Sequence, residues 1–218
     1  MTDQYSDMGE FHDLFMVDRW RELGDTLRDT FGHLTAAHRV LDLGAGTGLG
    51  TRALAAATAA RITAIEPSLV QRAQLTTRVL DDDDLVRRVT VLAQPLPQAL
   101  HNLPAPLDGF VAAHMLGHLD AAERRQTFAT LRQLLAPTGI GLITVQSDDI
   151  DEHDVTDTHS EEVTIGDLTY TATYSMLDDN VHLNEYTVRR GGRTLRTVSR
   201  RGEWVPLTTD TLRHELAS

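Results

Sequence analysis

Residues 39–50 read Arg-Val-Leu-Asp-Leu-Gly-Ala-Gly-Thr-Gly-Leu-Gly, an apolar strand that runs into a glycine-rich turn. Glycine occupies three alternate positions, Gly44, Gly46 and Gly48. Because glycine has no Cβ, the backbone bends sharply there and comes close to a ligand. An acidic residue, Glu66, closes the next apolar run. The turn and the acid together predict a ligand held against bare backbone at the end of a strand.

A dinucleotide-binding fold is the main alternative, since it also places a glycine turn after a strand and an acid about 20 residues later. The spacing argues against it. The pattern G-x-G-x-x-G that starts at Gly44 meets Leu49 where it needs glycine, and the one that starts at Gly46 meets Thr51. Asp42 also puts a carboxylate where the cationic amino-acid end of a cofactor could use it and where a pyrophosphate is repelled.

The run from Val40 to Gly48, followed by Glu66-Pro67, resembles the first two motifs of class I S-adenosylmethionine-dependent methyltransferases, of the small-molecule branch. The resemblance implies that the turn lies under the methionine part of S-adenosyl-L-methionine and that Glu66 bonds the ribose hydroxyls. S-adenosyl-L-homocysteine is then the product. The implied cofactor-binding residues are Asp42, Gly44, Ala45, Gly46, Gly48, Glu66, Pro67, Gln94 (in place of the usual acid for the adenine amino group) and His114.

Composition agrees with an enzyme of the cytoplasm. The chain has 218 residues and no cysteine, which excludes disulfides, thiolate metal sites and a cysteine nucleophile. The sequence shows no apolar stretch of about 18 residues and no signal peptide, so we expect no membrane partner. The net charge of −12 disfavours a nucleic-acid substrate, which needs a basic surface.

Acidic residues are dense at 81–84 and 148–162, and we interpret both runs as solvated loops. The second run contains residue types that bind metal ions, but without a tight spacing pattern, so we expect no metal site there. The candidate ligands in this run are Asp151, Glu152, His153, Asp154 and His159.

Alternating apolar runs and helix signals predict the fold. Ser68 with Gln71, and Asp120 with Glu123, match helix starts, and residues 137–139 read as a helix stop. The fold class is α/β, an open and mostly parallel Rossmann-like sheet flanked by helices, with a C-terminal antiparallel β meander. The expected strands are residues 39–43, 62–65, 89–92, 109–113 and 140–146.

Three parts of one domain are expected. Residues 1–35 form an N-terminal helical lid, 36–150 the cofactor-binding α/β core, and 151–218 a β-rich extension on the acceptor side. Family members usually end in one more antiparallel strand beside the fifth, and no sequence after Ser218 provides it. A shortened chain, a strand from a partner, or a meander that completes the sheet would each account for this.

Candidate catalytic residues occur in two places, after the fourth expected strand and near the N-terminus. His114 and His118 lie where the family lines its reaction centre, and histidine is suited to take a proton at neutral pH. Tyr5 heads a segment that resembles the tyrosine-led lid of small-molecule N-methyltransferases. The loop lacks the asparagine or aspartate, prolines and aromatic residue of enzymes that methylate adenine, cytosine or glutamine nitrogens.

These features predict an S-adenosylmethionine-dependent methyltransferase that acts on an amine or hydroxyl of a small metabolite, such as a natural-product intermediate. A homodimer is one assembly we consider. Three alternatives stay open. They are an NAD(P)-dependent oxidoreductase, a fold-sharing enzyme that binds the cofactor without transferring methyl, such as a cyclization catalyst, and a non-catalytic partner-binding domain.

Overall fold

A computed structural model describes residues 5–145, 158–178, 181–203 and 207–217. Its main sheet has five parallel strands in the order β3-β2-β1-β4-β5. This sheet confirms the predicted fold class, and its first three strands match the expected ranges within a residue. The strands are β1 (Arg39–Leu43), β2 (Arg61–Ile65), β3 (Val89–Leu92), β4 (Leu107–Ala112) and β5 (Leu135–Ile143).

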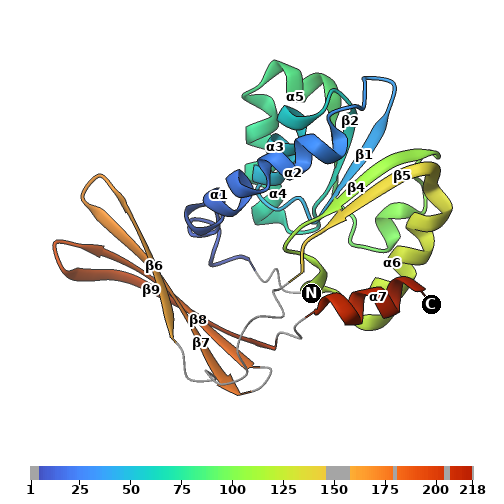
Figure 1. The fold of residues 1–218 in the computed structure, drawn as a ribbon. Helices are drawn as coiled ribbons and strands as arrows, with labels where there is room; N and C mark the ends of the chain where they lie inside the picture. The colour runs from blue at the N-terminus through green and yellow to red at the C-terminus, as the bar shows by residue number, and fades with distance from the viewer. Residues whose placement is uncertain (1–4, 146–157, 179–180, 204–206, 218) are drawn as a thin grey trace.

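Helices cover both faces of this sheet (Figure 1). Side chains alternate along each strand, so Val40 faces one helical layer and Leu41 the other. The first layer contains α1 (His12–Glu22), α2 (Gly24–Phe31), α3 (Leu49–Ala57), α4 (Leu69–Leu80) and α5 (Asp83–Arg88). The second contains η1 (Gln98–Leu100), η2 (Leu116–His118), α6 (Ala121–Leu134) and α7 (Thr209–Ala217).

Both predicted helix starts are confirmed. Ser68 precedes α4 and accepts a hydrogen bond from the Gln71 N–H at 3.2 Å. Asp120 and Glu123 form a reciprocal capping box at the start of α6.

The predicted boundary between α6 and β5 is wrong. Helix α6 ends at Leu134 and β5 begins at Leu135, so the expected stop at residues 137–139 lies inside the strand. The ladder between β4 and β5 shifts register after Leu107. Such an irregularity in an edge strand accommodates a proline and a glycine that regular pairing would not.

Four antiparallel strands form a second sheet, which confirms the predicted meander. They are β6 (His159–Ile165), β7 (Leu168–Asp178), β8 (Val181–Arg190) and β9 (Arg193–Glu203). This sheet stands beside the main one, so the alternative in which the meander completes the main sheet is wrong (Figure 1). Within the described residues β5 pairs with β4 alone.

Helix α1 connects the two sheets. The ring of Phe11, just before the helix, lies 5.2 Å from that of Tyr186 on β8, and Phe15 packs against the same tyrosine. Arg19 donates to Glu161 on β6 at 3.2 Å. The expected division at residues 35 and 150 stays a prediction, since the N-terminal helices also belong to the core of the main sheet.

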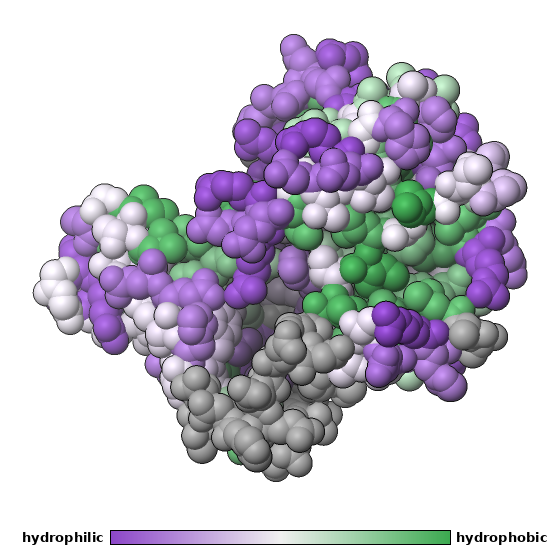
Figure 2. Space-filling view, in the orientation of Figure 1, coloured by the Kyte–Doolittle hydropathy of each residue, from purple (hydrophilic) through white to green (hydrophobic). Residues whose placement is uncertain are grey.

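The surface is unevenly hydrophobic. Figure 2 shows apolar residues gathered near β5 and α6, the side on which the main sheet ends. Ile140 on β5 is 45% exposed there. Elsewhere on this face, polar residues cover the first helical layer (Figure 2).

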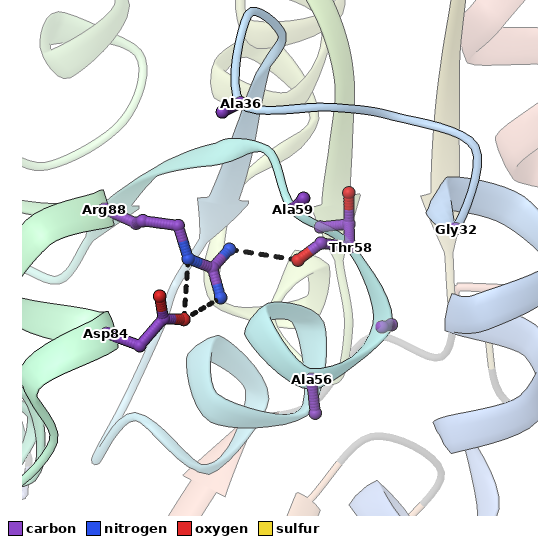
Figure 3. Close-up of a pocket in the computed structure, with 8 residues that line it drawn as sticks. Gly32, Ala36, Ala56, Thr58, Ala59, Asp84 and Arg88 are labelled. Atoms are coloured by element: carbon purple, nitrogen blue, oxygen red, sulfur yellow. Dashed lines mark hydrogen bonds and ion pairs between the residues drawn. The ribbon is translucent and has the colours of Figure 1, made fainter.

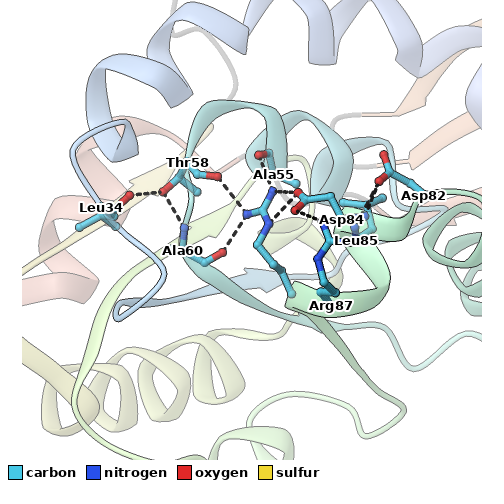
Figure 4. A network of polar contacts seen from close by, with 9 residues as sticks. Leu34, Ala55, Thr58, Ala60, Asp82, Asp84, Leu85 and Arg87 are labelled. Atoms are coloured by element: carbon cyan, nitrogen blue, oxygen red, sulfur yellow. Dashed lines mark hydrogen bonds and ion pairs between the residues drawn. The ribbon is translucent and has the colours of Figure 1, made fainter.

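Arg88 secures the edge of the main sheet at which the strands begin. Its guanidinium donates to the backbone oxygens of Thr58, Ala60 and Ala55 at 3.0, 2.9 and 2.9 Å, and to the Asp84 carboxylate (Figures 3 and 4). Arg88, Asp84 and Thr58 line a pocket at the end of α3 that lies away from the glycine turn. Because the cation satisfies carbonyls at the end of α3, we interpret this pocket as structural.

Replacing Arg88 with methionine is expected to lower the free energy of unfolding by about 2–3 kcal/mol, because it leaves several partly buried carbonyl oxygens without a hydrogen-bond donor. Chemical denaturation measures this. The neighbouring Arg87 is the matched control, since its side chain is 66% exposed and bonds only Asp84 among the described contacts. Its methionine variant should stay within about 0.5 kcal/mol of the wild type. Equal effects of the two variants would contradict this role of Arg88.

Candidate active site

The glycine turn joins β1 to α3, and its three glycines have different roles. Gly44, Gly46 and Gly48 all have positive φ angles, of 65°, 57° and 89°. A Cβ on Gly44 would lie 2.7 Å from Met115 Cβ, and one on Gly48 would lie 2.7 Å from Leu75 Cδ1. Protein packing therefore requires these two glycines, whereas the expectation that the turn brings its backbone close to a ligand stays a prediction. A Cβ on Gly46 would meet no atom closer than 3.7 Å, so packing alone does not require a glycine at this position.

Glu66 ends β2 and faces the turn. It is 6% exposed, and its Oε2 accepts the Gly46 N–H at 2.8 Å while Oε1 accepts the Ser68 N–H at 2.7 Å. Burial raises the pKa of this carboxyl. A carboxylate accepts about four hydrogen bonds, so two sites are left for a ligand with neighbouring donors. The remaining acceptor sites thus fit the two ribose hydroxyls that the family resemblance assigns to Glu66.

Asp42 lies beneath the turn, on the face of β1 that packs on α3. It is 2% exposed and accepts a hydrogen bond from the Thr51 hydroxyl at 2.6 Å. Burial, with the nearby charge of Glu66, raises its pKa to about 6. Its predicted contact with the methionine end of a cofactor stays a prediction.

The remaining predicted cofactor residues also lie at the ends of the strands. Ala45 is buried and donates its N–H to Ile65 O at 2.9 Å, which ties the turn to β2. Pro67 and Gln94 are exposed and follow β2 and β3. Their cofactor contacts stay predictions.

Tyr5 and His118 meet across the chain. The Tyr5 hydroxyl lies 3.0 Å from His118 Nε2, and the two rings meet edge to face. His118 ends the short helix η2 that follows β4. Although the residue is exposed, the protein around the imidazole, together with the nearby His12, holds its pKa below 6.5. A neutral His118 with its proton on Nδ1 accepts a hydrogen bond from the Tyr5 hydroxyl at Nε2.

His114 lies on the same loop in a strained conformation. Its φ of 57° is unusual for a residue with a side chain, and its N–H donates to the Thr144 hydroxyl at 2.8 Å. The ring meets Trp20 of α1 edge to face, with centroids 5.7 Å apart. Burial lowers the pKa of His114, and the nearby charges of Arg19 and His12 lower it further. The structure thus pairs Tyr5 with His118 and places His114 beside α1.

Three residues that the sequence analysis did not single out hold α1 to the turn. Asp13 accepts hydrogen bonds from the Thr47 hydroxyl and from Arg78, the latter at 2.5 Å. Arg78 on α4 also donates to Thr47 O at 2.5 Å. Periodicity predicted the helix from its apolar residues, whereas its polar side chains carry no spacing signal.

The acidic run is mostly outside the described residues, including Asp151, Glu152, His153 and Asp154. His159 lies in β6, 3.4 Å from Glu161. Within the described ranges, no group of three or more side chains is arranged to hold a metal ion. Nor does any helix in those ranges have the length and hydrophobicity needed to cross a membrane.

Comparison with known families identifies the core. Residues 40–139, which include the turn, Glu66 and both candidate histidines, match the family model of a methyltransferase domain. These residues form a methyltransferase domain. The search among curated proteins found no significant match to this methyltransferase.

Several solved structures share the methyltransferase fold over nearly the whole chain. CalS10, an amino pentose methyltransferase from Micromonospora echinaspora involved in calicheamicin biosynthesis, was solved with S-adenosylmethionine bound and is 18% identical (TM-score 0.68, 92% of this chain, 80% of that one). DesVI from Streptomyces venezuelae is 14% identical (TM-score 0.70, 96% of this chain, 88% of that one). The glycopeptide N-methyltransferase MtfA is 22% identical (TM-score 0.57, 92% of this chain, 81% of that one). At these identities the likeness shows the fold alone.

Proposed function

We propose that this methyltransferase binds S-adenosylmethionine at the carboxyl edge of its main sheet and methylates an amine of a small molecule, with a hydroxyl as the second possibility. The observation that carries the proposal is the contact of Tyr5 with His118 at the end of β4, on the same sheet edge as Glu66. The amino pentose and glycopeptide N-methyltransferases of similar fold favour an amine on a sugar-like or natural-product acceptor.

The cofactor half of the site uses Glu66 and the glycine turn. Glu66 would hold the ribose hydroxyls, and the turn with Asp42 would hold the methionine end. The cofactor supplies, when bound, an electrophilic methyl group on a sulfonium. The protein's main contribution is to align donor and acceptor, which lowers such a barrier by about 7–11 kcal/mol.

His118 is suited to take the acceptor's proton. An ammonium group has no lone pair, so an amine attacks only after it has lost a proton. Its lowered pKa leaves His118 neutral at pH 7. Nε2 would then act as the base when the acceptor replaces the Tyr5 hydroxyl as its hydrogen-bond donor. Tyr5 fixes the orientation of that ring and brings the N-terminal segment over the acceptor side. His114, beside Trp20, would orient the acceptor or contact the cofactor.

The pH profile provides one test. A base works only in its unprotonated form, and the pKa of His118 lies below 6.5, so kcat/KM should fall as the pH drops through the region below about 6.5. An acceptor amine adds its own rise at higher pH. The limb due to His118 should therefore be absent from His118→Asn, measured with the same acceptor. An unchanged acid limb in that variant would contradict the assignment.

Tyr5→Phe removes the hydroxyl and keeps the ring. We expect kcat to fall about 3- to 10-fold, the range of one neutral hydrogen bond, with little change in cofactor affinity. Tyr170→Phe on β7 is the control, since Tyr170 packs against Phe11 through its ring. Wild-type kcat in Tyr5→Phe would contradict the role of the hydroxyl.

The acceptor class is tested with matched pairs of amino sugars and the corresponding hydroxyl sugars, by following S-adenosylhomocysteine and methylated product. The proposal expects methylated product with amino members. Product from hydroxyl members alone would establish O-transfer. Cofactor binding without methylated product from any acceptor would favour a fold-sharing enzyme that transfers no methyl.

A homodimer and a cytoplasmic location stay predictions.

A further inference from the structure

Gln71 carries a buried polar atom with no partner. The residue is 1% exposed, and its Oε1 has no hydrogen-bond partner among the described residues. Its backbone N–H donates to the Ser68 hydroxyl at the start of α4, which fixes the main chain of Gln71. Buried polar groups are nearly always paired, and an exception at a binding site points to a ligand that supplies the missing donor.

The unpaired oxygen lies beside Gly46, the one glycine of the turn at which an added Cβ would meet no clash. A Cβ built on Gly46 would be 3.7 Å from Gln71 Oε1 and 3.7 Å from His12 Cε1. The Gly46 N–H is bonded to Glu66, and the Ser68 N–H to the other oxygen of the same carboxylate. Gln71 Oε1 and the Glu66 carboxylate are therefore two acceptors that both lie next to Gly46.

Two neighbouring acceptors select a ligand with neighbouring donors. A carboxylate or a phosphate would be repelled by them, whereas a vicinal diol donates to both. We propose that Gln71 Oε1 accepts a hydrogen bond from one ribose hydroxyl of the cofactor, beside the contact that Glu66 makes. The inference rests on the proposed cofactor, and it makes Gln71 a binding residue of this methyltransferase in addition to the motif residues.

The test is calorimetric titration of Gln71→Met with S-adenosylhomocysteine and with its 2′-deoxy and 3′-deoxy analogues. Methionine has a similar size and no strong acceptor. Affinity for S-adenosylhomocysteine should fall about 3- to 10-fold relative to the wild type. With the analogue that lacks the bonded hydroxyl, variant and wild type should bind equally. Because an unpaired buried oxygen is removed, the ligand-free variant should melt about 2–4 °C higher.

Gln126→Met is the matched control, since Gln126 is exposed on α6, and it should leave both affinity and melting temperature unchanged. Gln71→Asn, which withdraws the amide from the turn, should repeat the ligand-dependent pattern and serves if the methionine variant does not fold. Wild-type affinity in Gln71→Met, or an equal loss of affinity for all three ligands, would overturn the proposed role of Gln71. Neither outcome would affect the cofactor assignment. Failure of the wild type to bind S-adenosylhomocysteine would overturn the cofactor assignment as well.

Discussion

Glu66→Gln is expected to weaken binding of S-adenosylmethionine about 100-fold or more. The glutamine keeps the shape of the side chain but loses the charge, and hydrogen bonds to a charged group contribute about 1.5–3 kcal/mol each. Calorimetry at constant pH measures the loss. Glutamine is a cleaner test than alanine, because alanine would also release the backbone N–H groups of Gly46 and Ser68 that the carboxylate now pairs.

Glu162→Gln is the matched control for this substitution. Glu162 is exposed on β6 and should bind cofactor like the wild type after replacement. In Glu66→Gln, the new amide group would turn its protons toward a backbone N–H, so some loss of stability is expected. The titration must therefore be made well below the melting temperature of the variant. Micromolar binding unchanged in Glu66→Gln would contradict the assignment of the ribose contact.

His118→Asn is expected to lower kcat about 100- to 1,000-fold while cofactor affinity stays within a few-fold of the wild type. A positioned general base typically contributes a factor of this size, and asparagine cannot take up a proton at neutral pH. Single-turnover rates with an active acceptor, together with calorimetry, separate the two effects. His33→Asn, at an exposed histidine after α2, is the control and should change neither quantity.

The same substitution at His114 distinguishes the two histidines. If His118 is the base, His114→Asn should have a smaller effect on turnover, and any loss of cofactor affinity there would identify His114 as a cofactor contact. Wild-type turnover in His118→Asn, combined with a large loss in His114→Asn, would transfer the role of base to His114.

The sequence predicted the half of the site that local features specify. The strand at residues 39–43 was predicted with its observed ends, because a buried parallel strand and the glycine turn after it both have local signatures. Glu66 was found by its distance from the turn, and the structure places its carboxylate on the Gly46 N–H. The capping residues Ser68 and Asp120 were predicted for the same reason.

Contacts between distant segments could not be predicted. Tyr5 and His118 are 113 residues apart, and no local pattern indicates that their side chains meet. The packing of Met115 against Gly44, which makes that glycine necessary, also depends on the folded chain. The unpaired oxygen of Gln71 becomes visible only when burial and hydrogen bonding are both known, since the sequence identified this residue merely as a partner of the Ser68 cap.

The central claim is that the turn and Glu66 form a site for S-adenosylmethionine. Calorimetric titration of the wild-type chain with S-adenosylmethionine, S-adenosylhomocysteine, NAD and NADP, made in parallel, tests it most directly. The account predicts micromolar binding of the first two and no heat of binding from the two nicotinamide nucleotides. Binding of a nicotinamide nucleotide without binding of either sulfur compound would contradict it.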